Sequence, residues 1–379
     1  MENIDSAELT RRLLQIPLFR EIQNVIASQS GPVDWVAAEQ MATAVSKSGI
    51  RNPKATRTDA EEFQQAIRIS ELSVLGHTGL GPVQGVNQVS LQGRGPWATQ
   101  YLEHLKPLIE RLAKRFTEQV AVGGAAGGAG PLLGALGPYI MGLQIGLCVG
   151  YLSHKAVGDW DIGLPPKKPG RVVINYPNTL DVQSELDIPA EPLRMWLALR
   201  AVTRELHFQS VQWAGPYLNG LVHQYIDAAE IHTSELFHRL QNITDPQELT
   251  TLMQQPDELF PMLRSAGQEA VVDRIGAFLS VAEGYGDWIM NKAGAGMVQD
   301  YEKIREGMNR RRATRSSAEK MLEKMLGLDL PNEARRRGQR FIAEVAPSGA
   351  LDTLWAKPEH LPDTVELAQP ARWLTRLED

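Results

Sequence analysis

A stretch without any charged side chain, from Val120 to Ser153, constrains the fold more than any other part of the chain. It is long enough to cross a bilayer. Its first part, residues 123–131, is too rich in glycine to form a stable continuous helix, and Pro138 follows closely. The best helical piece therefore begins near Tyr139 and is only marginally long enough to span a membrane.

Three glycines follow at a spacing of four residues, at positions 142, 146 and 150. Glycines with this spacing lie on one face of a helix and let a second helix approach closely, either in a membrane or in the centre of a soluble helical domain. We expect the soluble alternative and no membrane span. Cys148 is the only cysteine of the chain, and its apolar neighbours indicate a buried thiol in a reducing compartment.

Net charge and the N-terminal sequence narrow the range of partners and locations. The formal net charge is −6 at pH 7, so the chain has no overall positive field to hold a phosphate backbone, and we expect no nucleic-acid partner. The basic run at residues 310–315 is interpreted as a solvated face or loop. The first residues are acidic and lack the apolar run of a secretory signal, so we expect a cytoplasmic protein.

Apolar residues at spacings of three and four predict a mainly α protein with a small β component. One short strand is expected at residues 171–176, where β-branched side chains lie between a glycine and a proline. Residues 84–95 are expected to form an exposed loop or lid, and Asp187 is expected to cap a long helix. The expected helices span residues 5–28, 33–47, 58–75, 96–119, 189–214, 217–238 and 268–293, with another beginning near residue 297.

A break with three prolines, at residues 159–170, separates two parts of the chain. We expect residues 1–158 to form an N-terminal helical part around the glycine-rich buried helix. Residues 159–379 are expected to form a second part with a helical tail. The two parts are expected to pack as one compact unit.

The most informative segment is the predicted helix 189–214, which contains Leu199-Arg-Ala-Val-Thr-Arg-Glu-Leu-His207. Other landmarks are Gly31-Pro-Val-Asp-Trp35, Thr78-Gly-Leu80, the glycine helix at residues 142–153, Trp196-Leu-Ala-Leu199, Glu283-Gly-Tyr-Gly-Asp287, Gly327-Leu-Asp329 and Trp355-Ala-Lys-Pro-Glu359. In their order and spacing the chain resembles a family of zincin-like, zinc-dependent metalloproteases or hydrolases, some of them associated with deazaflavin cofactor biosynthesis. The resemblance covers nearly the whole chain. It implies a zincin-like helical domain with a cleft between the 189–214 and 268–293 helices.

Zincin catalysis depends on the motif H-E-x-x-H, in which two histidines one helical turn apart bind zinc and the glutamate takes a proton from the metal-bound water. The resemblance places Arg200-Ala-Val-Thr-Arg204 at this motif. Arg200 and Arg204 then replace the histidines, and Ala201 replaces the glutamate. The resemblance also makes Glu283 the position of the third metal ligand, and this residue alone is retained.

These replacements remove metal binding and proton transfer together. A guanidinium group has no lone pair to give to a cation, and alanine cannot act as a base. We therefore expect no catalytic residue, no metal site and no cofactor. The chain is predicted to be a pseudoenzyme that uses the former active-site cleft to bind a peptide, a protein or an anionic small molecule. The predicted cleft residues are Arg200, Arg204, His207, Glu283, Tyr285 and Asp287.

The retained glutamate suggests a specific hypothesis about the two arginines. Arg200 and Arg204 lie on one helical face, so a guanidinium group can supply to Glu283 the positive charge that zinc would carry. In the alternative, the helix is slightly rotated and both arginines are solvated.

The alternative function is a metal-dependent hydrolase or peptidase that binds zinc in a rebuilt site. His207 lies two helical turns after Arg200 and can share its face. Pairing His207 with His223, His232 or His238 would require the next helix to fold back in a suitable geometry. A serine or cysteine nucleophile is not expected, because the chain has no Gly-x-Ser-x-Gly segment and Cys148 has no polar partner nearby in sequence.

Overall fold

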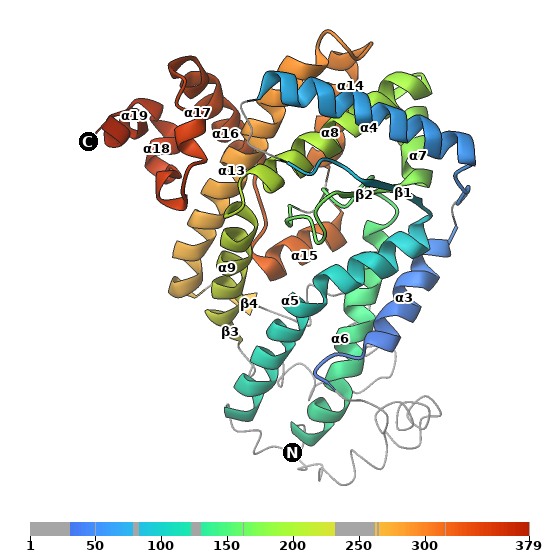
Figure 1. The fold of residues 1–379 in the computed structure, drawn as a ribbon. Helices are drawn as coiled ribbons and strands as arrows, with labels where there is room; N and C mark the ends of the chain where they lie inside the picture. Colours follow the sequence, from blue (N-terminus) through green and yellow to red (C-terminus); the bar gives the residue numbers. More distant parts are fainter. Residues whose placement is uncertain are drawn as a thin grey trace.

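The computed structural model describes residues 31–49, 51–78, 83–122, 130–161, 163–231, 262–263, 265–314 and 316–378. Over these residues the protein is mainly helical with two small two-stranded sheets, which confirms the predicted fold class. In Figure 1, α3, α5 and α6 lie on one side, α9, α13 and α16 on the other, and the short α15 between them. The predicted helix 5–28 and the histidines at positions 232 and 238 lie outside the described residues.

The glycines at positions 142, 146 and 150 make the closest helix crossing of the N-terminal half. They lie on α6 (Gly130–Leu152), which packs against α3 (Trp35–Lys47) and α5 (Arg94–Val122). A Cβ atom added at Gly146 would lie 2.3 Å from the backbone oxygen of Ala38, and one at Gly142 would lie 2.2 Å from that of Asp34. None of the described helices is both long and apolar enough to cross a membrane.

Helix α6 begins earlier than the sequence predicts. It begins at Gly130 rather than near Tyr139, with Pro138 in its interior. A proline inside a helix removes one backbone hydrogen bond. Here the Pro138 carbonyl accepts a hydrogen bond from the backbone N–H of Asp34 at 2.9 Å, and the packing of α6 on α3 outweighs the local cost.

The prediction of a loop or lid at residues 84–95 is wrong. Gln88–Gln92 forms β1, which pairs in parallel with β2 (Arg171–Asn175), the predicted strand. Val89 lies opposite Val172, and Leu91 lies opposite Ile174. The sequence did not indicate this strand, because β1 is partly exposed and contains glutamine and serine, which are also common in loops. Strand β2 is almost wholly buried and is rich in β-branched residues.

The long central helix, α8 (Ala190–Ser210), agrees with the predicted element, but its start differs. Asp187 does not cap it: this residue ends α7 (Tyr176–Leu186), an unpredicted helix, in a left-handed conformation with φ of 48°. Helix α4 (Arg57–His77) packs across both α8 and α13 (Ala266–Gly294), so elements of the two predicted parts are in direct contact.

Two further predictions need correction. The helix expected to reach residue 238 ends at Asp227 as α9 (Ala214–Asp227), because the chain turns into β3 (Glu230–Ile231), which pairs with β4 (Met262–Leu263). The basic run, interpreted as a solvated face or loop, is helical over residues 310–313, the last turn of α14 (Tyr301–Ala313). Arg310 is exposed there, whereas Arg311 and Arg312 are largely buried. The remaining helices are α15 (Ser317–Leu326), α16 (Asn332–Val345), α17 (Leu351–Leu354), α18 (Thr364–Ala368) and α19 (Pro370–Glu378), with 3₁₀ turns at Ala346–Ser348 and Pro358–His360.

Gly146→Ala is expected to destabilise the protein by about 1–3 kcal/mol or more, because the added methyl group meets the backbone of α3. Gly276→Ala is the matched control, since a Cβ atom there, within α13, has no heavy atom within 4 Å. Alanine in that open helical position should be neutral or stabilise by about 0.5–1 kcal/mol. Urea unfolding measures both changes, and equal midpoints for the two variants would contradict the close crossing.

Candidate functional site

Arg200 and Arg204 lie one turn apart on α8 and both face Glu283 on α13. Nη2 of Arg200 donates to Oε2 of Glu283 at 2.6 Å, and Nη1 of Arg204 lies 3.7 Å from Oε1. Their side chains are largely buried, 8% exposed for Arg200 and 13% for both Arg204 and Glu283. The structure therefore contains the hypothesised ion pair, and the two arginines are not solvated.

Two more guanidinium groups reach the same carboxylate from elements that the sequence did not connect with it. Nη1 of Arg312, on α14, donates to Oε2 of Glu283 at 3.3 Å. Nε of Arg335, on α16, lies 4.0 Å from the same oxygen. Among the described residues, Glu283 thus has four arginines within 4.0 Å. We call this group, with Asp287, the arginine cluster.

Asp287 is the second carboxylate of the arginine cluster, one helical turn after Glu283. It accepts a hydrogen bond from Nη1 of Arg200 at 3.1 Å and another from Nε2 of Gln339 at 2.7 Å. Arg200 therefore bridges both carboxylates of α13. Four guanidinium groups face two carboxylates, so the arginine cluster has more positive than negative charge.

A second glycine crossing allows α16 to reach the arginine cluster. A Cβ atom added at Gly338 would lie 1.9 Å from the backbone oxygen of Ser280, and one at Gly284 would lie 2.6 Å from the backbone of Gly338. Larger residues at either position would push α16 away from α13. The crossing brings Arg335 and Gln339 into contact range of the α13 carboxylates.

Burial and the excess of guanidinium groups over carboxylates determine the pKa values in the arginine cluster. Burial alone would raise the pKa of Glu283, but the guanidinium groups, that of Arg200 foremost, hold it well below its ordinary value. Burial lowers the pKa of Arg200, yet Glu283 and Asp287 raise it above the ordinary arginine value. Burial lowers the pKa of Arg204, and the nearby charge of Arg200 lowers it further. The carboxylate is thus ionised and shared among competing cations.

His207 and Tyr285 belong to an aromatic group rather than to the arginine cluster. The His207 ring lies 4.3 Å from the ring centre of Trp355 and 5.0 Å from that of Tyr285. Burial, together with the charge of Arg204, lowers the pKa of His207 to about 3, so the ring is neutral at physiological pH. Its aromatic contacts make His207 a core residue.

The donor set at this site does not suit a zinc ion. Arginines stand on the α8 face that points at Glu283, and a guanidinium group has no lone pair for a metal. Within the described part of the chain, no group of three or more His, Cys, Asp or Glu side chains could hold a metal ion. Of the alternative ligands, His223 lies on α9 near Asp227, outside the arginine cluster.

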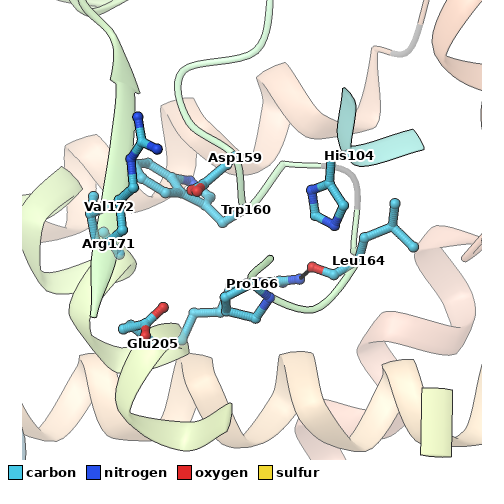
Figure 2. A pocket seen from close by; sticks show the side chains of 10 residues that line it. His104, Asp159, Trp160, Leu164, Pro166, Arg171, Val172 and Glu205 are labelled. Atoms are coloured by element: carbon cyan, nitrogen blue, oxygen red, sulfur yellow. Dashed lines mark hydrogen bonds between the residues drawn. The ribbon is translucent and has the colours of Figure 1, made fainter. Parts of the chain in front are cut away.

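Little open space remains around these side chains. The cavity lined by Arg200, Arg204, His207 and Glu283 has a volume of about 30 Å³. A second cavity of about 10 Å³ lies on the other side of Arg204. Figure 2 shows this second cavity, with His104 and Asp159 on opposite sides of the opening and Glu205 at its lower edge. The smaller cavity has room for about one water molecule and the larger for about two.

Comparisons with known proteins agree with this architecture. Residues 33–374 match the model of a family described as zincin-like metallopeptidase. A protein from Chloroflexus aurantiacus, whose crystal structure is described as that of "a putative hydrolase with a novel fold", superimposes with a TM-score of 0.65 at 22% sequence identity. The alignment covers 91% of this chain and 99% of that one, which shows a shared fold. A search of curated proteins finds no match.

Sequence reasoning found Arg200, Arg204, Glu283 and Asp287 but missed the contributions of α14 and α16. Two signals were present. One is the basic run that carries Arg312, and the other is Arg335-Arg-Arg337 shortly before Gly338. Neither signal specifies a carboxylate partner without the helix crossings that the structure shows.

Glu283→Gln is expected to destabilise the fold by about 3–5 kcal/mol, because it leaves buried guanidinium groups without their shared counterion. Glu61→Gln is the matched control. It breaks an exposed pair with Arg57 on α4 and should change stability by less than about 1 kcal/mol. Urea unfolding at pH 7 measures both. A Glu283→Gln value as small as that of the control would contradict the role assigned to the arginine cluster.

His207→Phe is expected to flatten the dependence of stability on pH. The folded pKa, about 3, lies below the ordinary value of 6.5, so the unfolded chain binds a proton first as pH falls. The contribution of His207 is complete above pH 6.5 and declines toward pH 3, by up to about 1.4 kcal/mol per pH unit. Unfolding free energies measured between pH 7 and 4 should therefore fall less steeply in the variant. Parallel curves would contradict a neutral, buried His207.

Proposed function

We propose that this chain, which belongs to the zincin-like metallopeptidase family, is a non-catalytic member that acts by binding a ligand rather than by hydrolysis. The observation that carries the proposal is the set of arginines that engages Glu283. In an intact zincin motif, α8 would present two imidazoles and a glutamate on this face. Here it presents Arg200, Ala201 and Arg204.

We further propose that the protein uses no zinc at this position. A divalent cation beside Glu283 would have to displace guanidinium groups that already neutralise the carboxylate. Ala201 has no side-chain group that could take a proton from a metal-bound water. The missing ligands support the absence of zinc, and the missing base supports the absence of hydrolysis.

In this proposal the arginine cluster replaces the metal as the element that joins helices. Zinc would connect α8 to α13, whereas the arginines connect these two helices and also α14 and α16. A structural role for the arginines is compatible with a binding role nearby, because Arg204 also lines the cavity of Figure 2. Cys148 is buried and forms no disulfide, which is compatible with a reducing compartment, and we propose the cytoplasm.

The competing proposal is a metal-dependent hydrolase with a rebuilt site. The observation in its favour is that His104, Asp159 and Glu205 line one cavity beside Ala201 (Figure 2). The hydrogen bonds of Glu205 argue against a metal site there. Its Oε1 already accepts hydrogen bonds from the backbone N–H of Gly170 at 2.6 Å and from Nε2 of Gln209 at 2.7 Å. The metal content of the protein decides between the two proposals.

The protein purified without added zinc is expected to contain no stoichiometric metal by atomic absorption, because arginines occupy the positions of α8 that contact Glu283. Stoichiometric zinc, removed by a chelator together with a hydrolytic activity, would establish the competing proposal instead.

The combined substitution Arg200→His, Ala201→Glu and Arg204→His provides a positive control for the geometry. It places two imidazoles where the guanidinium groups face Glu283, so this variant is expected to take up zinc that the natural chain does not. Adding Glu283→Gln to the same variant should weaken that uptake. Zinc uptake that does not depend on residue 283 would show that the metal lies elsewhere.

A further inference from the structure

A larger cleft lies beside the arginine cluster and takes no part in the zincin-like site. Its volume is about 160 Å³, and it opens between α5, β2 and the segment before β2. Its lining shares His104, Asp159 and Arg171 with the small cavity of Figure 2. Arg204 also lines that small cavity. The cleft is therefore adjacent to the helix that carries the former motif.

Cations gather on one side of the cleft. Lys167 and Lys168 come from the exposed segment before β2, and Arg171 begins that strand. Nζ of Lys167 donates to the backbone oxygen of Glu103 at 2.6 Å, which holds this lysine against α5 while two of its three N–H groups stay available. Nη2 of Arg171 donates to Gln100 at 2.9 Å. These contacts hold two of the three cations at the cleft before any ligand binds.

Two polar groups in the wall of the cleft have no partner among the residues that the structure describes. The hydroxyl of Tyr101 is buried without a hydrogen bond, although the residue is only 3% exposed. Nε of Arg171 is buried and unpaired as well. A buried donor without a partner has lost its hydrogen bonds to water and gained none in return. A ligand that accepts hydrogen bonds from both groups would replace them.

The charges of the cleft indicate the charge of this ligand. Among the described residues, its lining has three cations, Lys167, Lys168 and Arg171, and two carboxylates, Glu103 and Asp159. Burial raises the pKa of Asp159 to about 7, against the opposing effect of Arg204, so this carboxyl group takes up a proton more readily than an exposed aspartate does. Burial lowers the pKa of His104 to about 4, so its ring adds no charge there.

We infer that this cleft binds a phosphate dianion, free or as a small phosphate monoester, held by Lys167, Lys168 and Arg171 and by the hydroxyl of Tyr101. The three cations outnumber the two carboxylates, and the raised pKa of Asp159 increases this excess beyond one charge, which a dianion offsets more fully than a single carboxylate does. Lysine binds phosphate as a point charge from a flexible stem. A phosphate also presents acceptor oxygens in several directions, as the unpaired hydroxyl of Tyr101 and the unpaired Nε of Arg171 require. The volume suits a small anion with a few waters.

The inference deepens the binding role proposed above, because it gives that role a place and a ligand class. It fails separately from that proposal, since phosphate binding is measured whether or not the chain contains zinc.

The test is isothermal titration calorimetry of the full chain with inorganic phosphate, phenyl phosphate and acetate at matched ionic strength. We expect saturable binding of phosphate at one site, with acetate at least about tenfold weaker, because a monoanion leaves part of the positive charge uncompensated. Tighter binding of phenyl phosphate would identify a monoester as the ligand, and tighter binding of inorganic phosphate would identify the free ion. Absence of saturable phosphate binding, or acetate binding as tight as phosphate, would overturn the inference.

Variants locate the bound anion. Lys167→Gln with Lys168→Gln should weaken phosphate binding by about tenfold or more, whereas Lys114→Gln with Lys320→Gln, which removes two exposed charges outside the cleft, should not. Tyr101→Phe should weaken binding about fivefold while the melting temperature stays the same or rises, because the substitution removes an unpaired buried hydroxyl. Equal losses in both lysine pairs, or unchanged affinity in Tyr101→Phe, would show that phosphate does not bind at this site.

Discussion

The carboxylate of Glu283 is the point on which the arrangement of the C-terminal helices depends. Guanidinium groups from α8, α14 and α16 converge on it from three sides, while the residue itself belongs to α13. Burying an ion is costly, and only well-placed counterions and hydrogen bonds offset that cost. Because one carboxylate serves four cations, the four helices are coupled: a shift of any one changes the environment of the others.

Such a cluster can form only if the helices approach closely enough, and glycines set that distance. Gly338 lies against the backbone of Ser280 on α13, which brings Arg335 and Gln339 within reach of the two carboxylates. Gly146 does the same for α6 and α3 in the N-terminal half. The two crossings differ in their consequence. The first positions charged side chains around a buried site, whereas the second brings two helices together in the hydrophobic core.

Local sequence signals predicted most helices, because apolar residues repeat every three to four positions in a helix whichever element packs against it. They also predicted that Arg200 and Arg204 share a face, which follows from helix geometry, while the choice of Glu283 as their partner came from a family resemblance. The loop predicted at residues 84–95 failed because β1 exists only through pairing with β2, some eighty residues away. Arg312 and Arg335 were missed for the same reason: their partner is set by helix crossings, which are long-range contacts.

In the proposed replacement of a metal by arginines, the site keeps its positive charge, but that charge extends over a larger region. Zinc would concentrate two positive charges at one point between its ligands, whereas guanidinium groups spread theirs over several helices. Arg204 illustrates the difference: one nitrogen lies 3.7 Å from Glu283, yet the same side chain lines the neighbouring cavity with His104 and Asp159. Its charge lowers the pKa of His104 and opposes the rise in the pKa of Asp159, so it acts on both sides of α8.

A cluster with more cations than carboxylates contributes positive potential to the adjacent cleft. The charges of Lys167, Lys168 and Arg171 add to this potential. Arg204 thus links the proposed loss of the metal site to the proposed anion-binding cleft, because its side chain contacts Glu283 and also lines the cavity next to that cleft.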